Sequence, residues 1–312
     1  MKTSVFLIVN KLVMLFSPAN QVLRRIPGAK IVYASIYRRL RPKETILVVC
    51  QGSRMYACAS DIGLVPNLLA DGVYERQQTE LFKQIIRPGM VVIDIGANFG
   101  YYTLLAARLL HDRGRVVAFE PEPRNYGLLL NNLRLNDCTN VIAIKKAVSN
   151  KNGKLRLFID ELNLGMHSLS EKNVSRKTGF VEAGTLCLDD YLGNVLKIHK
   201  VDLMKIDVEG AEGLVIQGAT RTLRHVDRIF MAFWPRGLRN LGTNPLGLVR
   251  RLRRFGFRIM IVDENQGCYR ELERRELALM IESKHDPACN LFLERQIRSG
   301  RRKPRTMSSI DH

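Results

Sequence analysis

The chain has 312 residues, of which 46% are hydrophobic and 25% are charged, and these proportions exclude an intrinsically disordered protein. It carries 49 Lys and Arg against 30 Asp and Glu, a formal net charge of +19. This excess favours anionic partners but does not choose among nucleic acid, an acidic membrane face and a phosphorylated substrate. The six cysteines are widely scattered without a C-x-x-C pair, so neither a metal site nor a disulfide framework is predicted.

Residues 1–45 are predicted to form a basic N-terminal arm with a short apolar helix. Its apolar stretch, residues 5–16, is interrupted by Asn10 and Lys11 and is too short to span a bilayer. We expect this helix to dock on the protein or to make a peripheral membrane contact, helped by the basic residues that follow it. The predicted localisation is cytoplasmic, with membrane association as the alternative. Residues 46–80 are predicted to be an extension that packs on the core.

From residue 81 onward, short β-rich runs alternate with helical stretches. Most of the runs are nearly continuously apolar, which is typical of strands covered on both faces. This alternation predicts an open, doubly wound α/β domain over residues 81–296 with a mostly parallel, seven-stranded sheet. The last two runs are expected to form a hairpin that makes one edge antiparallel. The runs lie at 90–96, 115–121, 140–149, 202–208, 228–234, 257–263 and 290–295.

Residues 150–187 interrupt the alternation. Two strand-like segments there flank a polar stretch, and we interpret them as a strand pair that carries a loop. An insertion beyond the carboxyl edge of a parallel sheet is where a substrate is commonly contacted. Residues 297–312 are basic, have no apolar period and are predicted to be a disordered tail.

The stretch "VVIDIGANFGYYT", residues 91–103, contains the clearest ligand-binding signal. A strand is predicted to end at Asp94, and a turn through Gly96, Asn98 and Gly100 leads into a helix. A dinucleotide site would read G-x-G-x-x-G, but Asn98 stands where the second glycine would bring the backbone against a pyrophosphate. The loop therefore suits an adenosine-type ligand without phosphates, with Asp94 placed to meet a positive or hydrogen-bond-donating group.

Glu120 ends the next predicted strand, where an acid can accept hydrogen bonds from both ribose hydroxyls. Either acid alone would be an ordinary solvated turn residue. The order strand, acid, glycine loop, helix, strand and acid is a stronger signal, and it points to S-adenosylmethionine as the cofactor.

Three stretches, "VVIDIGANFGYYTLLAA", "AFEPEPRNYGLLLNN" and "LMKIDVEGAE", resemble the FkbM family of S-adenosylmethionine-dependent methyltransferases. Many methyltransferases share the glycine loop, and its combination with "KIDVEGAE" makes the resemblance specific. The resemblance implies a Rossmann-like class I methyltransferase fold for the domain at 81–296. It also implies O-methylation, with the hydroxyl of a sugar, glycolipid or natural product as the acceptor.

Methyl transfer is an in-line displacement, so it depends on correct placement of the acceptor oxygen and on a base for the hydroxyl proton. Asp207 is the first candidate for the base or for orienting the acceptor, and it would also contact the cofactor. Glu209 is the second candidate. Glu212 more simply caps the helix that follows. His167 is another candidate base, although most lone histidines are structural or merely exposed.

Three further residues are candidate acceptor contacts. Asn163 and Ser168 could hydrogen-bond a polyol, and Trp234 could stack on a sugar ring or serve as a core residue at a strand end. One position departs from the family pattern, because the resemblance leads us to expect Glu where this chain has Ala232. Either another acid substitutes for it or the activity is altered.

Two alternatives stay open. The net charge and the arginine-rich stretch 250–258 favour an RNA ribose methyltransferase. However, "KIDVEG" offers no proline or aromatic residue to stack a flipped base, and no basic platform with interleaved aromatics is evident, so nucleic acid is not the expected partner. The other alternative is a non-catalytic scaffold, which only Ala232 supports. The expected partner is a small-molecule or glycan hydroxyl acceptor, and the oligomeric state is not indicated.

Overall fold

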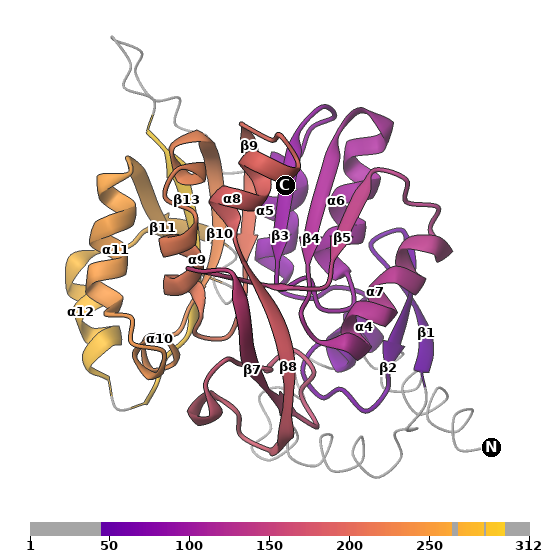
Figure 1. The fold of residues 1–312 in the computed structure, drawn as a ribbon, viewed down its shortest axis with the longest axis horizontal. Helices are drawn as coiled ribbons and strands as arrows, with labels where there is room; N and C mark the ends of the chain where they lie inside the picture. Colours follow the sequence, from indigo (N-terminus) through magenta and orange to yellow (C-terminus); the bar gives the residue numbers. More distant parts are fainter. Residues whose placement is uncertain (1–44, 264–267, 284, 297–312) are drawn as a thin grey trace.

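The computed structural model describes residues 45–263, 268–283 and 285–296 (Figure 1). Apart from Thr45, the predicted basic arm lies outside the described residues, as does the predicted tail at 297–312. The expected apolar helix, membrane contact and disorder are therefore not tested. Within the described ranges, no helix is both long enough and apolar enough to cross a membrane.

A sheet of eight strands forms the centre of the fold, in the order β12-β11-β13-β10-β9-β3-β4-β5 (Figure 1). Five neighbouring strands are parallel, as the apolar runs predicted, and the doubly wound α/β fold is confirmed. The parallel strands are β3 (Val91–Ile95), β4 (Arg115–Phe119), β5 (Val141–Ile144), β9 (Val201–Ile206) and β10 (Val226–Phe233).

The antiparallel edge differs from the prediction in two ways. Strands β11 (Phe257–Asp263) and β13 (Cys289–Arg295) do pair, but β13 also pairs with β10 and so lies between β10 and β11. They are therefore not a simple edge hairpin. An additional strand, β12 (Cys268–Glu271), pairs with β11 and makes eight strands instead of seven. Its sequence, CYRE, is exposed at all four positions, so it carries no pattern of burial that a sequence could reveal.

Helices cover both faces of the sheet and bury alternate strand residues in two cores. Val92 and Leu203 belong to the first core, whereas Ile93 and Met204 belong to the second. The first core also contains residues of α4 (Val65–Asp71), α5 (Arg76–Ile85), α6 (Tyr101–Leu110) and α7 (Pro123–Leu135). The second contains residues of α8 (Leu188–Asp190), α9 (Glu212–Gly218), α10 (Pro235–Asn240), α11 (Pro245–Arg254) and α12 (Arg274–Glu282). Single turns lie at η1 (His111–Arg113), η2 (Glu171–Asn173), η3 (Tyr191–Val195) and η4 (Thr222–His225).

A second sheet carries the predicted loop. It has the order β6-β8-β7, and the antiparallel pair β7–β8 projects from the main sheet (Figure 1). This confirms the interpretation of residues 150–187 as a strand pair with a loop. The strands are β6 (Ala147–Ser149), β7 (Gly153–Asp160) and β8 (Lys177–Cys187).

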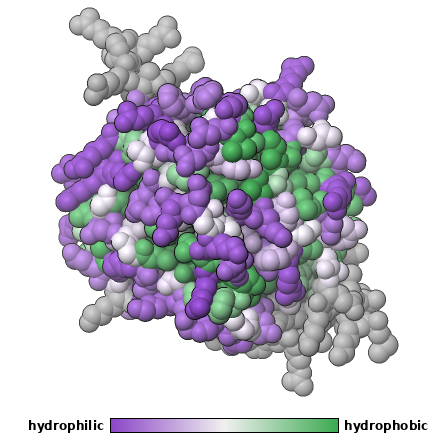
Figure 2. All heavy atoms as spheres, in the orientation of Figure 1, coloured by the Kyte–Doolittle hydropathy of each residue, from purple (hydrophilic) through white to green (hydrophobic). Residues whose placement is uncertain are grey.

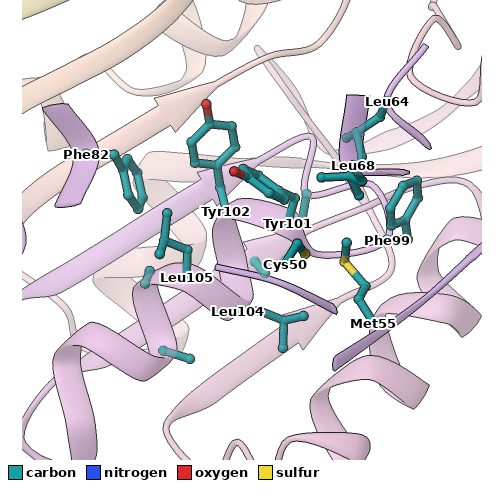
Figure 3. Packing of buried hydrophobic residues seen from close by; sticks show 14 of the residues in the cluster. Cys50, Met55, Leu64, Leu68, Phe82, Phe99, Tyr101, Tyr102, Leu104 and Leu105 are labelled. Carbon is teal, nitrogen blue, oxygen red and sulfur yellow. The ribbon is translucent and has the colours of Figure 1, made fainter. Parts of the chain in front are cut away.

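An N-terminal hairpin of β1 (Thr45–Cys50) and β2 (Ser53–Cys58) packs on the first core. Its Met55 lies among buried residues that include Phe99 and Leu104 (Figure 3). The buried side chain of Asn132, on α7, fastens the hairpin by accepting a hydrogen bond from the Tyr56 N–H (2.6 Å) and donating to the carbonyls of Tyr56 (2.9 Å) and Phe99 (2.8 Å). Hydrophilic residues cover most of the face shown in Figure 2, with smaller hydrophobic patches between them.

Replacing Asn132 with Ala is expected to lower the free energy of unfolding by about 2–4 kcal/mol, because the buried Phe99 carbonyl and the Tyr56 backbone lose their partner. Urea denaturation measures this. Asn131→Ala is the matched control, since the neighbouring Asn131 is exposed, and it should cost less than about 0.5 kcal/mol. Equal effects of the two substitutions would contradict the role given to Asn132.

Candidate active site

A cavity opens where the carboxyl ends of β3, β4 and β9 meet, which is the usual ligand position in an open parallel sheet. The loops after these strands form its floor, and the loop after β7 forms a wall. The lining includes Tyr74, Asp94, Gly96, Ala97, Asn98, Tyr102, Glu120, Asn125, Lys146, Asn163, His167, Lys205, Asp207 and Glu209.

The loop after β3 is held tightly against the loop after β9. Gly96 has φ 86°, and a Cβ there would collide with the carbonyl oxygen of Asp207. Only glycine therefore fits, because the contact leaves no space for a side chain. Asn98 is also left-handed, with φ 52°, and Gly100, with φ 103°, forms the N-cap of α6.

The protein itself uses every backbone N–H of this loop. Those of Gly96 and Ala97 both donate to the Phe119 carbonyl at 3.0 Å, and that of Asn98 donates to Glu120 Oε2 at 2.8 Å. The N–H groups of Phe99 and Gly100 donate to Asn98 Oδ1 and to the Ala97 carbonyl, respectively. No free row of N–H groups is left to bind a diphosphate, which is what such loops offer in dinucleotide sites.

Asp94 and Glu120 both line the cavity. Asp94 Oδ2 accepts a hydrogen bond from Thr103 (2.6 Å), while its buried Oδ1 has no partner among the described residues. Glu120 accepts the N–H groups of Asn98 and Glu122, each at 2.8 Å. Burial raises the pKa of Asp94, and it raises that of Glu120 to about 8 although both backbone hydrogen bonds oppose it. Both carboxyl groups can accept further hydrogen bonds from a ligand.

Lys205 is a site residue that the sequence analysis missed. It is the register partner of Asp94 in the adjoining strand, and its Nζ lies 2.8 Å from Asp207 Oδ2. The residue is buried, with 4% exposure. Burial acts to lower the pKa of Lys205, but Asp207, Asp94 and Glu75 together raise it to about 12. A charged residue inside the apolar run "DLMKIDV", two positions before Asp207 and hence on the same strand face, was the available signal.

The two glutamates after Asp207 differ in their surroundings. Glu209 lines the cavity with a left-handed φ of 50°, and burial, followed by the charges of Asp207 and Glu212, raises its pKa well above the usual range. Glu212 is buried, and its Oε1 accepts the N–H groups of Val208 (3.2 Å) and Gly210 (3.3 Å). Glu212 therefore fixes the turn that begins α9, in keeping with the simpler interpretation of this residue.

His167 lines the cavity, but its hydrogen bonding does not suit a base. Its Nδ1 accepts the N–H of Asp160 at 3.1 Å, so the proton of the neutral ring is assigned to Nε2. Nε2 is buried and has no partner among the described residues, and burial lowers the pKa of the ring. His167 is thus a neutral ring whose one remaining donor, Nε2–H, is buried, and neither nitrogen is free to take a proton, which corrects its prediction as a general base.

Of the three predicted acceptor contacts, only Asn163 lines the cavity. The buried hydroxyl of Ser168 donates to the Glu209 carbonyl (2.7 Å) and accepts from Asn173 (3.2 Å), so it fixes the loop. The ring of Trp234 packs on Gly237 so closely that a Cβ at position 237 would collide with the ring. Trp234 is not among the described residues that line the cavity. The prediction for Ser168 was therefore wrong, because its hydroxyl turns toward neighbouring backbone, whereas that for Trp234 stays a prediction.

The N-terminal extension contributes Tyr74 to the cavity lining, and its Glu75 contacts another lining residue, Tyr102. Glu75 accepts hydrogen bonds from Gln78 (2.6 Å), Tyr102 (2.9 Å) and Asn290 (2.8 Å). No sequence pattern joined these two residues to the motifs that follow residue 90. Their place in the site comes from packing between segments that are far apart in the chain.

Comparison of this sequence with known proteins shows to which family it is similar. Residues 94–259 match the Methyltransferase FkbM domain. Methyltransferase 1 of Beauveria bassiana is 27% identical over 143 residues, covering 41% of this chain and 57% of the relative. The 2-O-methyltransferase NoeI of Sinorhizobium fredii is 26% identical, covering 47% and 64%. The 31-O-demethyl-FK506 methyltransferase FkbM of Streptomyces tacrolimicus is 29% identical, covering 50% and 67%. The aligned part therefore spans 57% to 67% of the length of these relatives.

We expect the His167 ring to be neutral near pH 7 with its proton on Nε2, because Nδ1 is an acceptor and burial lowers the pKa. Long-range proton–nitrogen NMR spectra distinguish the two tautomers and the charged ring. Signals that disappear in His167→Gln assign this residue. A charged ring, or a proton on Nδ1, would restore His167 as a candidate acid or base.

Proposed function

Because this chain belongs to the FkbM methyltransferase family, we propose that it is an S-adenosylmethionine-dependent O-methyltransferase acting on a hydroxyl of a sugar, glycolipid or natural product. The observation that carries this proposal is the pair of buried carboxyl groups, Asp94 and Glu120, that face one cavity from adjacent strand ends. They stand beside a loop whose N–H groups are all in use.

These residues fit the cofactor. Glu120 would accept hydrogen bonds from the ribose hydroxyls of S-adenosylmethionine. The unpartnered Oδ1 of Asp94 would accept a hydrogen bond from the ammonium group in the methionine part of the cofactor, or attract its charge. The loop after β3 excludes a diphosphate, but an adenosine without phosphates needs no row of free amides. When bound, S-adenosylmethionine supplies an electrophilic methyl group.

The remaining chemistry falls to the chain's own side chains, which must orient the acceptor hydroxyl and take its proton. Asp207 is already bound to the Lys205 ammonium, so it is better suited to positioning. Glu209 forms no ion pair with Lys or Arg within the described ranges. Burial raises the pKa of its carboxyl group, so its carboxylate, once formed, is a good proton acceptor. This reverses the order of the two acids that the sequence suggested. The left-handed backbone of Glu209 adds support, since strained residues cluster at active sites.

The side chains near this carboxylate favour an uncharged acceptor. The pKa of Tyr74 is raised well above 10. The largest cause is the negative charge of Glu75, followed by burial and by the charges of Asp207 and Glu209. Tyr74 is therefore a neutral hydroxyl donor. A neutral phenol can bind a hydroxyl, whereas the carboxylates beside it repel a phosphodiester, which argues against RNA as acceptor. Two relatives named for O-methylation agree with a hydroxyl acceptor.

Glu120→Ala is expected to weaken binding of S-adenosylhomocysteine at least tenfold, about 1.4 kcal/mol, because the ribose loses its acceptor and Asn98 loses its anchor. Isothermal titration calorimetry measures this. Glu182→Ala is the control, since Glu182 pairs with Lys154 on the exposed face of β8, and it should bind as the wild type does. Absence of binding by the wild type would contradict the proposed function, and equal binding by Glu120→Ala would contradict the ribose contact.

Glu209→Gln is expected to lower turnover by about 10²- to 10³-fold while leaving cofactor affinity nearly unchanged, because it removes the proton acceptor. The readout is mass spectrometry of cell extracts incubated with the protein and isotopically labelled methyl donor. Labelled oxygen-linked products made by the wild type and not by the variant support the proposal. Label on RNA would favour the ribose methyltransferase instead, and wild-type rates in Glu209→Gln would exclude Glu209 as the base.

A further inference from the structure

Four charged side chains meet at the end of the cavity formed by β3 and β9, and we call them the Lys205 cluster: Lys205, Asp94, Asp207 and Glu75. Asp94 and Lys205 are neighbours on the same face of the paired strands. Asp207 binds the Lys205 ammonium at 2.8 Å. The ammonium lies 4.7 Å from the centre of the Tyr102 ring, whose hydroxyl donates to Glu75 at 2.9 Å. The cluster is therefore continuous from β3 to the N-terminal extension.

The charges of this cluster do not balance. The positive charge of Lys205 acts to lower the pKa of both Asp94 and Glu75. Lys205 also forms an ion pair with Asp207. Glu75 receives its hydrogen bonds from two amides and a phenol, all neutral. With every group ionised, one positive charge faces three negative charges. Lys205 and Asp94 are buried and Asp207 and Glu75 are half-buried. Such an excess of negative charge is unfavourable there, and bound protons or a positively charged ligand would offset it.

One acceptor of this cluster is buried without a hydrogen-bond donor among the described residues. Asp94 Oδ1 is buried in a residue only 2% exposed, has no partner among the described residues, and belongs to a side chain that lines the cavity. A positive charge in the cavity, beyond the ammonium group that the cofactor and its product both carry, would further compensate the excess of negative charge. A neutral thioether of the same shape would not.

We propose that the Lys205 cluster makes this site selective for the sulfonium form of its ligand, and that Glu75 is the residue that sets the degree of selectivity. The inference rests on the proposed function, since the two forms to be distinguished are S-adenosylmethionine and its neutral thioether product, S-adenosylhomocysteine. The donor then binds more tightly than the product, and loss of the positive charge on methyl transfer favours product release. Glu75 lies outside the matched region 94–259, in the extension.

Proton exchange gives this inference a direct signature. Burial raises the pKa of Glu75 to about 7 and Lys205 opposes this, so the free protein holds part of a proton there near neutral pH. A cationic ligand favours the carboxylate and expels that proton to solvent, whereas a neutral ligand leaves it in place. The charged and titratable groups that act together with Glu75 are Lys205, Asp207, Glu209, Tyr74, Tyr101 and Tyr102.

The test is calorimetry of the full chain near pH 7 in two buffers of different ionisation enthalpy, which counts the protons released on binding. We expect S-adenosylmethionine to release more protons than S-adenosylhomocysteine and to bind at least about fivefold more tightly, with a ratio that grows between pH 6 and pH 8. An analogue with an ammonium in place of the sulfonium should behave like the donor, which separates charge from the bulk of the methyl group.

Glu75→Gln should shrink both the affinity ratio and the difference in proton release. Glu80→Gln is the matched control on α5, the helix that Glu75 precedes, because Glu80 pairs with Lys83 at 2.9 Å on the surface, and it should change neither quantity. If Glu75→Gln is folded and its ratio of affinities for S-adenosylmethionine and S-adenosylhomocysteine equals that of the wild type, the role proposed for Glu75 is overturned. If that variant does not fold, the comparison of the three ligands on the wild type still tests whether the site selects for a positively charged ligand.

Two outcomes separate this inference from the proposed function. Equal affinities and equal proton counts for the three ligands would overturn charge selectivity while leaving a cofactor site in place. Failure of all three ligands to bind would overturn the proposed function itself.

Discussion

The candidate site depends on the parallel pairing of β3 with β9. Their register sets Asp94 beside Lys205 and ends both strands at the same edge of the sheet. The loops that follow then touch where Gly96 meets the Asp207 carbonyl, so neither can move without the other. Because the contact fixes both backbones, Asp94 and Asp207 approach one ammonium from two strands. A rigid arrangement of this kind holds charged groups in place before a ligand arrives.

The sequence identified those site residues whose position follows from a single strand, loop and helix. Asp94, Gly96 and Glu120 belong to such units, and all three line the cavity as the motif order predicted. Ser168 was misplaced because the direction of a side chain in an irregular loop depends on what it packs against. The same limit applies to the fold. Parallel strands were recognisable from apolar runs, whereas the position of β13 between β10 and β11 is a matter of pairing order.

His167 and Lys205 show opposite failures of pattern reasoning. A histidine in a loop next to a cleft suggested a base, yet the backbone N–H of Asp160 occupies the nitrogen that would take the proton. A lysine in an apolar strand attracted no functional hypothesis, yet it carries the charge around which the acids gather. In both cases the role is set by the partner of one atom, and residue type alone does not reveal that partner.

Ala232 lies on the interior strand β10, close to a residue that contacts the extension. It stands where the family resemblance led us to expect Glu, and its register partner across β10 and β13 is Asn290. The Asn290 amide donates to Glu75 at 2.8 Å, so a carboxylate from the extension approaches this part of the sheet although the strand itself lacks one. An acid on a strand would be fixed by the sheet, whereas Glu75 is held by Gln78, Tyr102 and Asn290. Since these donors are neutral, they position the carboxylate without cancelling its charge, which leaves that charge available to a cation in the cavity.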